Sequence, residues 1–537
     1  MITVQPIPLT VHQRIPYALP PVDERRFRQP VPIDKWNGTI DGTVFGPSCA
    51  QRTPRHPDPP SGTSEDCLHL NVYTTAACRL SLCPVVFYVH GGLMAYDTPA
   101  YFPDEMLSTN FPSQGIVLVT VGFRVNLFGA MYIGDENAMP ANLAIHDVVY
   151  GLRFTRSILH SFGGDKERLT IMGHSSGGTM CMVLAFSPII SPPGEPLLFS
   201  NVALLSMGAR LEKPEKGLTR ARRFTTAVGC GGSAQEAVDC LRTKSTEELL
   251  ETYYRLAGEN VGDDSILGVT VAGELLPGTT AMDLLKNAKP FRLIIGTVAK
   301  EFDATGTSDT LPGTNEALWL LDVVNYDECY GKYERDRREG RFEPDATSTS
   351  QDIFLGHYLF AKAVARAGGE VYLYQYDYPR HALHTDDLSY IMGVHLFEKD
   401  ATEGWLSRVY PVYFTNFANG SRPAPDWISV DENLMNYYSV NKSFSDAISP
   451  HMEMDYHKDI ADYYLKELLP YDAYISQRKL NKAISIEYHK MIFSIPDTSV
   501  LSIIFILLLS VLCLFVLAFR YSTVKEEKQP LLSKSRV

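Results

Sequence analysis

The sequence predicts an α/β protein whose central sheet is mainly parallel and is covered by helices on both faces. Continuous apolar runs rich in β-branched residues occur at 84–89, 115–121, 169–172, 202–206, 291–296 and 371–376. Segments with helical spacing, such as 143–159, lie between these runs. Strands that are apolar along their whole length are typical of parallel sheets buried on both faces, and alternation with helices indicates βαβ connections.

Composition and charge narrow the possible function classes. The 537 residues are 45% apolar and 21% charged, which is typical of a globular protein and not of a disordered chain. A formal net charge of −13 argues against a general nucleic-acid binder, which would present a basic surface. No Cys/His cluster has the spacing of a metal site, so we predict no bound metal.

Three parts of the sequence indicate secondary structure less clearly. Residues 6–32 are rich in proline, and we expect extended, irregular chain there. After residue 291 the strand patterns lie far apart, which indicates long helical or irregular insertions. The charged run at 333–343 is expected to be a solvated face or a loop.

Residues 168–179 combine the third apolar run with the motif Gly173-His174-Ser175-Ser176-Gly177 and a short apolar helix pattern. Gly-x-Ser-x-Gly between a strand and a helix predicts a nucleophile elbow, a sharp turn that leaves little room for side chains beside the serine. Ser175 would project its hydroxyl from this turn, with the N–H of Ser176 and the helix N-terminus behind it. The motif alone is equally compatible with an ordinary Gly/Ser-rich turn.

A second glycine turn, His90-Gly91-Gly92, follows the apolar run at 84–89. Its backbone N–H groups could face an oxyanion, because glycine lets a substrate approach the backbone closely. A serine hydroxyl also needs a base to take its proton and a third group to orient that base. A strand-to-loop turn without chemistry is the alternative for this motif.

Residues 498–519 are 22 residues without a charge, between Asp497 and Arg520. At about 1.5 Å per residue a helix of this length spans a hydrocarbon core of roughly 30 Å. We therefore predict one globular body at 1–490, a transmembrane helix at 498–519 and a short tail at 520–537. The excess of Lys and Arg in the tail places it in the cytosol.

The sequence indicates the cellular compartment of the globular body less directly. Residues 1–19 contain no recognisable signal peptide, so either the chain is tail-anchored with a cytosolic body, or its true start is missing and the body is lumenal or extracellular. The second hypothesis is favoured by cysteines that could close small disulfide loops (Cys49 with Cys67, Cys230 with Cys240) and by three glycosylation acceptors (Asn37, Asn419 and Asn441). Cys78 and Cys83 could pair or remain free thiols, and Cys329 has no predicted partner.

Several longer motifs, in order along the chain, resemble the type-B carboxylesterase/cholinesterase family from about residue 15 to 469. They are Ile15-Pro-Tyr-Ala-Leu-Pro-Pro21, Arg26-Phe27, Phe45-Gly-Pro-Ser-Cys49, Ser64-Glu-Asp-Cys-Leu-His-Leu-Asn-Val-Tyr73 and Phe162-Gly-Gly-Asp165. The resemblance implies an α/β-hydrolase fold and hydrolysis of a small carboxylic ester through an acyl-enzyme. It implies no metal or organic cofactor.

The family's site residues carry over to matching positions. Ser175 corresponds to the nucleophile. Glu301, at the end of Gly296-Thr-Val-Ala-Lys-Glu301, corresponds to the triad acid. His384 corresponds to the base, because Asp386-Asp387-Leu388-Ser389-Tyr390 follows it with the family's spacing; His381 is the competing histidine.

The same resemblance implies further groups around the triad. The N–H groups of Gly92, Leu93 and Ser176 would form the oxyanion hole. The implied disulfides are Cys49–Cys67 and Cys230–Cys240, which agrees with the loop argument.

Some positions depart from the family pattern. Leu93 stands where Gly or Ala is common and could narrow the acyl site, Phe302 follows the acid where glycine is frequent, and Arg14 and Asp23 replace usual glycines. No aromatic residue lies between Cys49 and Cys67, where cholinesterases place a tryptophan that binds a quaternary ammonium, so a choline ester is not the expected substrate. The rival hypothesis is a weak or inert adhesion or receptor ectodomain, similar to the neuroligins, which share the fold.

The tail contains Glu527-Lys-Gln-Pro-Leu531-Leu532, with Glu527, Leu531 and Leu532 in the pattern of an acidic dileucine signal. This resemblance implies that sorting adaptors bind the tail and direct the protein to endosomes or lysosome-like organelles. The expected partners are therefore a small-molecule ester, a membrane and such adaptors.

Overall fold

The computed structural model describes residues 9–33, 38–52, 58–192, 194–209, 211–257, 268–278, 280–303, 315–343, 346–394, 396–493 and 505–517. The chain divides into two compact units, Met1–Leu469 and Pro470–Val537. The first unit contains the sheet and every predicted catalytic residue.

A sheet of ten strands forms the centre of the first unit within these described residues. The strand order is β1-β4-β6-β5-β7-β8-β9-β10-β11-β12, and β2 and β3 form a separate pair. The strands are β1 (Leu9–Pro16), β2 (Ser48–Cys49), β3 (Thr63–Ser64), β4 (His69–Thr75), β5 (Cys83–Val89), β6 (Val117–Val121), β7 (Gly164–His174), β8 (Asn201–Leu205), β9 (Arg292–Val298), β10 (Val371–Tyr376), β11 (Tyr437–Val440) and β12 (His451–Glu453). All neighbours from β6 to β10 are parallel, as the apolar runs predicted, and β11, which was not predicted, pairs parallel with β10.

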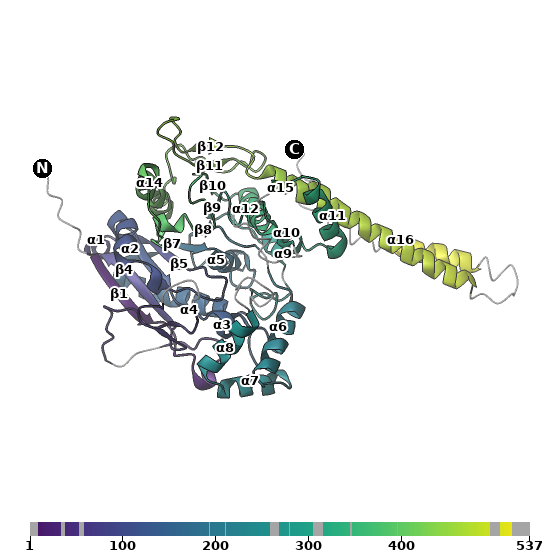
Figure 1. Cartoon of the computed structure of the whole chain (residues 1–537), viewed down its shortest axis with the longest axis horizontal. Helices are drawn as coiled ribbons and strands as arrows, with labels where there is room; N and C mark the ends of the chain where they lie inside the picture. The colour runs from purple at the N-terminus through teal and green to yellow at the C-terminus, as the bar shows by residue number, and fades with distance from the viewer. Residues whose placement is uncertain are drawn as a thin grey trace. The chain divides into compact units, whose positions relative to one another are not determined.

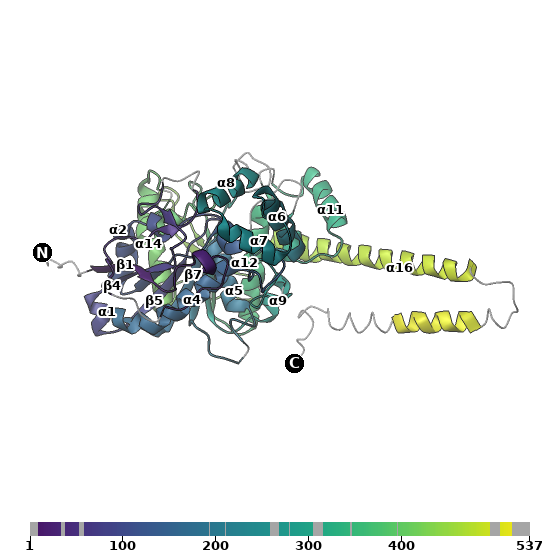
Figure 2. The same cartoon turned by 90° about the horizontal axis from the view of Figure 1, so that it is seen from below.

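Helices cover both faces of this sheet (Figures 1 and 2). The helices of the first unit are α1 (Ala76–Leu80), α2 (Asp104–Asn110), α3 (Asn126–Ala130), α4 (Leu143–Ile158), α5 (Ser176–Phe186), α6 (Pro214–Ala227), α7 (Ala234–Thr243), α8 (Thr246–Ala257), α9 (Ala281–Lys286), α10 (Glu316–Leu320), α11 (Tyr326–Arg338), α12 (Ser348–Arg366), α13 (Leu388–Ile391), α14 (Ala401–Ala418) and α15 (Lys458–Asp462). The next helix, α16 (Leu469–Phe493), lies in the second unit apart from its first residue. Shorter helical turns occur at Asp23–Arg25, Pro99–Tyr101, Pro112–Gln114, Leu159–Phe162 and Tyr463–Leu468.

The two faces of the sheet have different coverings. Helices α2 and α14 pack on one face in a cluster that is unusually rich in tyrosine and includes Tyr374, Tyr410 and Trp427. On the other face, Gly151 of α4 lies so close to Val121 and Phe87 that a side chain there would contact both. In Figure 1, α14 lies above the sheet and α4 below it. The carboxyl ends of the parallel strands, where ligands bind in open α/β sheets, remain between these layers.

The N-terminal edge of the sheet was not predicted. The proline-rich start contains β1, which pairs antiparallel with β4, and β4 pairs antiparallel with β6. β1 is mostly half-exposed and carries polar residues, so it lacks the continuous apolar pattern of a central strand. The charged run at 333–343 overlaps α11, a helix that buries Cys329 and Tyr333 and leaves its other residues half-buried or exposed, so 333–338 is a helix face and not a loop.

Two of the positions where the family usually has glycine keep a left-handed backbone without it. Arg14 has φ 58° and Asp23 has φ 53°. Such a conformation costs a residue with a side chain about 1–2 kcal/mol relative to a right-handed one. The fold therefore retains the turn geometry that these positions need, although the sequence no longer provides glycine.

The second unit contains α16 and a helix at 505–517 among its described residues. Within the described ranges, no helix combines the length and the apolar character needed to cross a membrane. The predicted span at 498–519 lies only partly in these ranges. The tail with Glu527, Leu531 and Leu532 lies wholly outside them.

Candidate active site

The predicted nucleophile lies in a strained turn between β7 and α5. Ser175 has φ 54° and ψ −127° and is 8% exposed, and its N–H donates to the carbonyl of Leu205 at 2.9 Å. A side chain at Gly173 would meet the carbonyl oxygen of Gly177 at 2.4 Å, and one at Gly177 would meet that of Val89 at 2.2 Å. Both flanking glycines are therefore required by close backbone contacts, as expected for a nucleophile elbow.

The structure brings the three predicted triad residues into one hydrogen-bonded row. Ser175 Oγ is 2.9 Å from His384 Nε2, and His384 Nδ1 is 2.5 Å from Glu301 Oε2. The side chain of Glu301 is fully buried and that of His384 is 10% exposed. A carboxylate can only accept, so Nδ1 carries the proton in this pair; in the neutral ring Nε2 is then unprotonated toward the serine hydroxyl, which is the tautomer that a general base requires.

Backbone hydrogen bonds join the loop of the acid to the loop of the base. The N–H of His384 donates to the carbonyl of Glu301 at 2.7 Å, and that of Lys300 donates to Ala382 at 3.1 Å. The second carboxylate oxygen of Glu301 accepts from the N–H of Val298 at 3.2 Å. The distance between acid and base is thus set by main-chain contacts as well as by the side chains.

The N-terminus of α12 holds the residues that follow the acid. The N–H of Phe302 donates to Ser350 Oγ at 3.1 Å, and the carboxylate of Asp303 accepts from the N–H of Thr347 at 3.2 Å. A carboxylate at a helix N-terminus is favourable because it meets unpaired N–H groups there. Phe302 is consequently fixed at the site, where its ring contacts His384.

The loop after β5 presents the predicted oxyanion-hole amides. Gly92, Leu93 and Met94 all have positive φ, at 93°, 58° and 59°. Among the described residues, none accepts a hydrogen bond from the N–H of Gly92, Leu93 or Ser176. Unpaired amides beside the nucleophile match the requirement of an oxyanion hole.

Three polar side chains tie this strained loop to the rest of the fold. Ser176 Oγ accepts from the N–H of Met94 at 3.1 Å. Asn126 donates from its backbone to the carbonyl of Met94 and from its side chain to Ala95. Gln51 accepts from the N–H of Asp97 at 2.7 Å, which completes the attachment.

Two buried carboxyl groups lie close to this machinery. Burial and, to a smaller extent, the charge of Glu301 raise the pKa of Asp387 to about 7, against the hydroxyl of Tyr410 that donates to it at 3.0 Å. Burial also raises the pKa of Asp97, in the oxyanion loop, to about 7, although the N–H of Thr98 donates to it. Both carboxyl groups therefore hold their protons more tightly than an exposed aspartate does.

The histidine bound to Ser175 is His384, whereas the competing histidine, His381, is held by other partners. Its Nδ1 is 2.6 Å from a carboxylate oxygen of Glu403, and its ring stacks on Phe397 with centroids 3.6 Å apart. Glu403 is buried and belongs to the N-terminal cap of α14. The spacing argument for His384 and the contacts of His381 thus agree.

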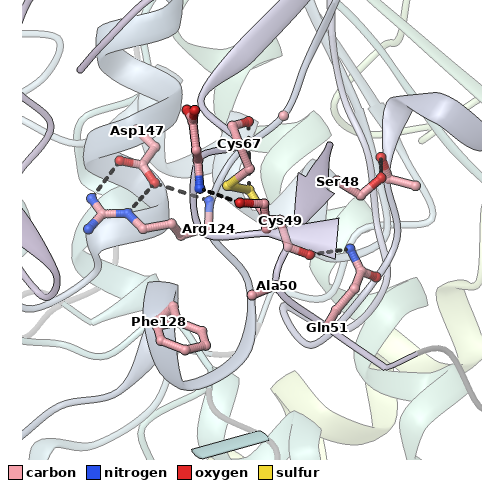
Figure 3. The surroundings of a disulfide bond; sticks show 12 residues. Ser48, Cys49, Ala50, Gln51, Cys67, Arg124, Phe128 and Asp147 are labelled. Atoms are coloured by element: carbon pink, nitrogen blue, oxygen red, sulfur yellow. Dashed lines mark hydrogen bonds and ion pairs between the residues drawn. A yellow bond between two sulfur atoms is a disulfide. The ribbon is translucent and has the colours of Figure 1, made fainter. Parts of the chain in front are cut away.

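Both expected disulfides, Cys49–Cys67 and Cys230–Cys240, are present. The structure adds Cys78–Cys83, which the sequence left open. Figure 3 shows the surroundings of Cys49–Cys67, where Gln51 donates to the carbonyl of Cys49 and Arg124 forms a two-pronged pair with Asp147. The same Gln51 side chain also donates to the carbonyl of Asp97 in the oxyanion loop, so it links the disulfide-bonded Cys49 to the site.

The predicted glycosylation acceptors differ in exposure. Asn419 is exposed and Asn441 is half-buried, whereas Asn37 lies outside the described residues.

Several residues of the site carry no sequence signal of their own. Gln51, Asn126 and Ser350 act through hydrogen bonds to backbone groups distant in sequence, and no motif marks them. His174 stands inside the elbow motif, and its ring centroid lies 4.9 Å from that of His384. Phe302 was visible only as a departure from the family pattern.

Comparisons with known proteins find one family and several related proteins. A family model described as the Carboxylesterase family matches residues 2–459. The chain is 28% identical to liver carboxylesterase 1 of Oryctolagus cuniculus over 488 residues, which is 79% of this chain and 84% of the relative. It is 34% identical to juvenile hormone esterase of Tribolium castaneum over 249 residues (44% and 40%) and 32% identical to a carboxylic ester hydrolase of Bombus ignitus over 240 residues (43% and 41%).

Proposed function

This chain belongs to the carboxylesterase family and is a carboxylic ester hydrolase, and we propose that it acts as a serine esterase through Ser175, His384 and Glu301. The observation that carries the proposal is the row of hydrogen bonds from Ser175 Oγ through His384 to the buried carboxylate of Glu301. An inert adhesion ectodomain would not need this arrangement.

The proposed reaction has two halves that use the same groups. His384 takes the proton of Ser175 as Oγ attacks the ester carbonyl, and it then gives that proton to the leaving alcohol. In the second half His384 activates a water that hydrolyses the acyl-enzyme. Glu301 keeps the imidazole oriented and stabilises its positive charge in both halves.

The N–H groups of Gly92, Leu93 and Ser176 are the proposed donors to the tetrahedral oxyanion. Their support is the left-handed loop beside Ser175 and the lack of competing acceptors among the described residues. Leu93 contributes only its backbone to this function, so replacement of the usual Gly or Ala keeps the donor. Its side chain would instead limit the size of the acyl group.

Labelling with a fluorophosphonate probe tests the proposed nucleophile. We expect the parent protein to be labelled and Ser175→Ala to remain unlabelled. Ser157→Ala, which changes an exposed serine of α4, serves as the control and should be labelled like the parent. An unlabelled parent, or equal labelling of Ser175→Ala, would contradict the proposal.

We further propose that the body is lumenal or extracellular and is anchored by residues 498–519, with residues 520–537 in the cytosol. Three disulfides support an oxidising compartment. The 22 uncharged residues of the segment support the anchor, and its described part, 505–517, is a helix with exposed apolar side chains. Glu527, Leu531 and Leu532 would then be available to sorting adaptors.

A further inference from the structure

The ring of Phe302 lies against the ring of His384. Their centroids are 4.4 Å apart and their planes differ by 27°, which is a stacked arrangement. The hydrogen bonds of His384 to Ser175 and Glu301 leave from nitrogens in the plane of the imidazole, so they leave its two faces to other neighbours. A ring on one face opposes tilting about the line that joins the two nitrogens, a movement that these two hydrogen bonds resist weakly.

The position of Phe302 is set by a helix and not by the loop alone. Its N–H is bound to Ser350 in the first turn of α12, and the next residue, Asp303, is bound to the N–H of Thr347 that caps the same helix. Glu301 on its other side is buried. The ring is therefore presented to His384 from a rigid support.

The stack also has an electrostatic consequence. In the proposed mechanism His384 becomes an imidazolium each time it accepts a proton. The face of an aromatic ring attracts a cation placed over it, and the effect grows where water is excluded. Phe302 would therefore stabilise the charged form of His384 at the moment when it is needed.

We propose that Phe302 is a positioning residue for the esterase reaction: its stacked ring holds the imidazole of His384 in line between Ser175 and Glu301 and stabilises the imidazolium. This inference rests on the proposed function, because it concerns the same triad. It assigns a role to the side chain that replaces the family's frequent glycine after the acid.

A substitution at Phe302 removes none of the other titratable groups near His384. They are Glu301 after β9, His174 at the end of β7, His357 on α12, and Asp386 and Asp387 in the segment that follows His384. A difference in pH profile between Phe302 variants therefore reports the ring.

The test compares ring-removing and ring-keeping variants of the full chain with p-nitrophenyl butyrate as the probe. For Phe302→Leu we expect kcat to fall about three- to tenfold, KM to stay within about twofold, and the midpoint of the acidic limb of the kcat/KM profile to move to lower pH by about half a unit. Phe302→Tyr and Phe302→Trp keep a ring and should restore all three values to near those of the parent.

A matched control is Phe354→Leu, which removes a similar ring–histidine stack that does not include His384. Phe354 stacks on the buried His457 with centroids 3.7 Å apart. This variant should lower the thermal midpoint and leave the pH profile of kcat/KM unchanged.

Any of three results would overturn the inference. Phe302→Leu could have the same kcat and the same pH midpoint as the parent, or Phe302→Tyr could be as impaired as Phe302→Leu. The third result is a shift of the pH midpoint in Phe354→Leu that equals the shift in Phe302→Leu. If the parent hydrolyses no ester, the proposed function itself fails. If the parent is active and Phe302→Leu matches it, only the role of Phe302 fails.

Discussion

Ser176 offers two separate groups to the site, and its hydroxyl is the one that local sequence does not reveal. The amide is a proposed oxyanion donor, whereas Oγ accepts from the N–H of Met94 and ties the strained loop to the elbow. Leu93 and Met94 both occupy the left-handed region, which is unfavourable for residues with side chains. The hydroxyl therefore compensates for strain that glycine would avoid.

Ser176→Ala should lower kcat about tenfold and leave KM nearly unchanged, because it keeps the amide but loosens the loop. Complete loss of one oxyanion donor would cost roughly 10²–10³ in turnover, so the expected effect is smaller. Ser176→Thr retains a hydroxyl and should stay close to the parent. Steady-state kinetics of the three proteins decide the question, and an unimpaired Ser176→Ala would show that the loop holds its shape without this bond.

A buried histidine on α12 makes stability depend on pH. His357 has its Nδ1 2.8 Å from the carbonyl oxygen of Ile353, and burial lowers its pKa to about 4. Between pH 6.5 and about 4 the unfolded chain binds a proton at this residue and the folded chain does not. Protonation of the unfolded chain at His357 therefore lowers the free energy of unfolding as the pH falls through this window, by up to about 1.4 kcal/mol per pH unit.

His357→Gln cannot titrate, so its free energy of unfolding should fall less steeply than that of the parent between pH 6.5 and 4.5. Asp387→Asn should have the opposite effect, because the raised pKa of Asp387 makes the folded state hold the extra proton between pH 3.8 and about 7. Urea unfolding at several pH values measures both slopes. Parallel slopes in parent and variants would contradict these assignments.

At the scale of elements, a side chain from the N-terminal region binds the end of α7. Arg26 donates to the carbonyl of Leu241 at 3.2 Å and of Lys244 at 2.7 Å. Its guanidinium also forms a two-pronged pair with Glu65, and both side chains are about nine-tenths buried. These contacts join three parts of the chain that are far apart in sequence, beside the Cys49–Cys67 disulfide.

Glu65→Leu should destabilise the fold by about 3–5 kcal/mol, because it leaves the buried Arg26 without its carboxylate. The double variant Arg26→Met, Glu65→Leu should recover a large part of this loss. Glu247→Ala breaks an exposed pair with Arg52 and should cost less than about 1 kcal/mol. Urea midpoints of the four proteins give the comparison, and similar losses for the buried and the exposed pair would refute it.

At the scale of the whole molecule, disulfides, acceptor asparagines and the uncharged C-terminal segment make one consistent proposal about topology. Peptide-N-glycosidase treatment of protein from its native membrane should increase its mobility on a gel, and Asn419→Gln should reduce this shift because Asn419 is exposed.

Alkaline carbonate should leave the full chain in the membrane and release a chain truncated after Lys490. An unglycosylated protein with reactive thiols at Cys49 and Cys67 would instead favour the cytosolic, tail-anchored hypothesis.

The strands that are buried on both faces were predictable, because each of β5 to β10 carries a continuous mainly apolar run in its buried part. The polar start of β7, residues 164–168, lay outside the predicted run. β1 and β4 were missed because edge and antiparallel strands tolerate polar residues, so their patterns resemble irregular chain. The three proposed triad residues could be named in advance because each stands in a motif just after a predicted strand or beside recognisable neighbours.

The local sequence was enough to predict a feature wherever one short segment restricts its own residue types. At Gly173 and Gly177, for example, close backbone contacts exclude any side chain. Contacts between distant segments needed the fold: Phe302 on His384, Met94 on Ser176 and Arg26 on the end of α7 join residues whose separation in sequence carries no information about their distance in space. A stacked ring or a hydrogen bond to a backbone group places few constraints on residue type, so it leaves no motif. Motifs in the sequence therefore identify the residues proposed to react, whereas the contacts that hold these residues in place form only when the chain folds.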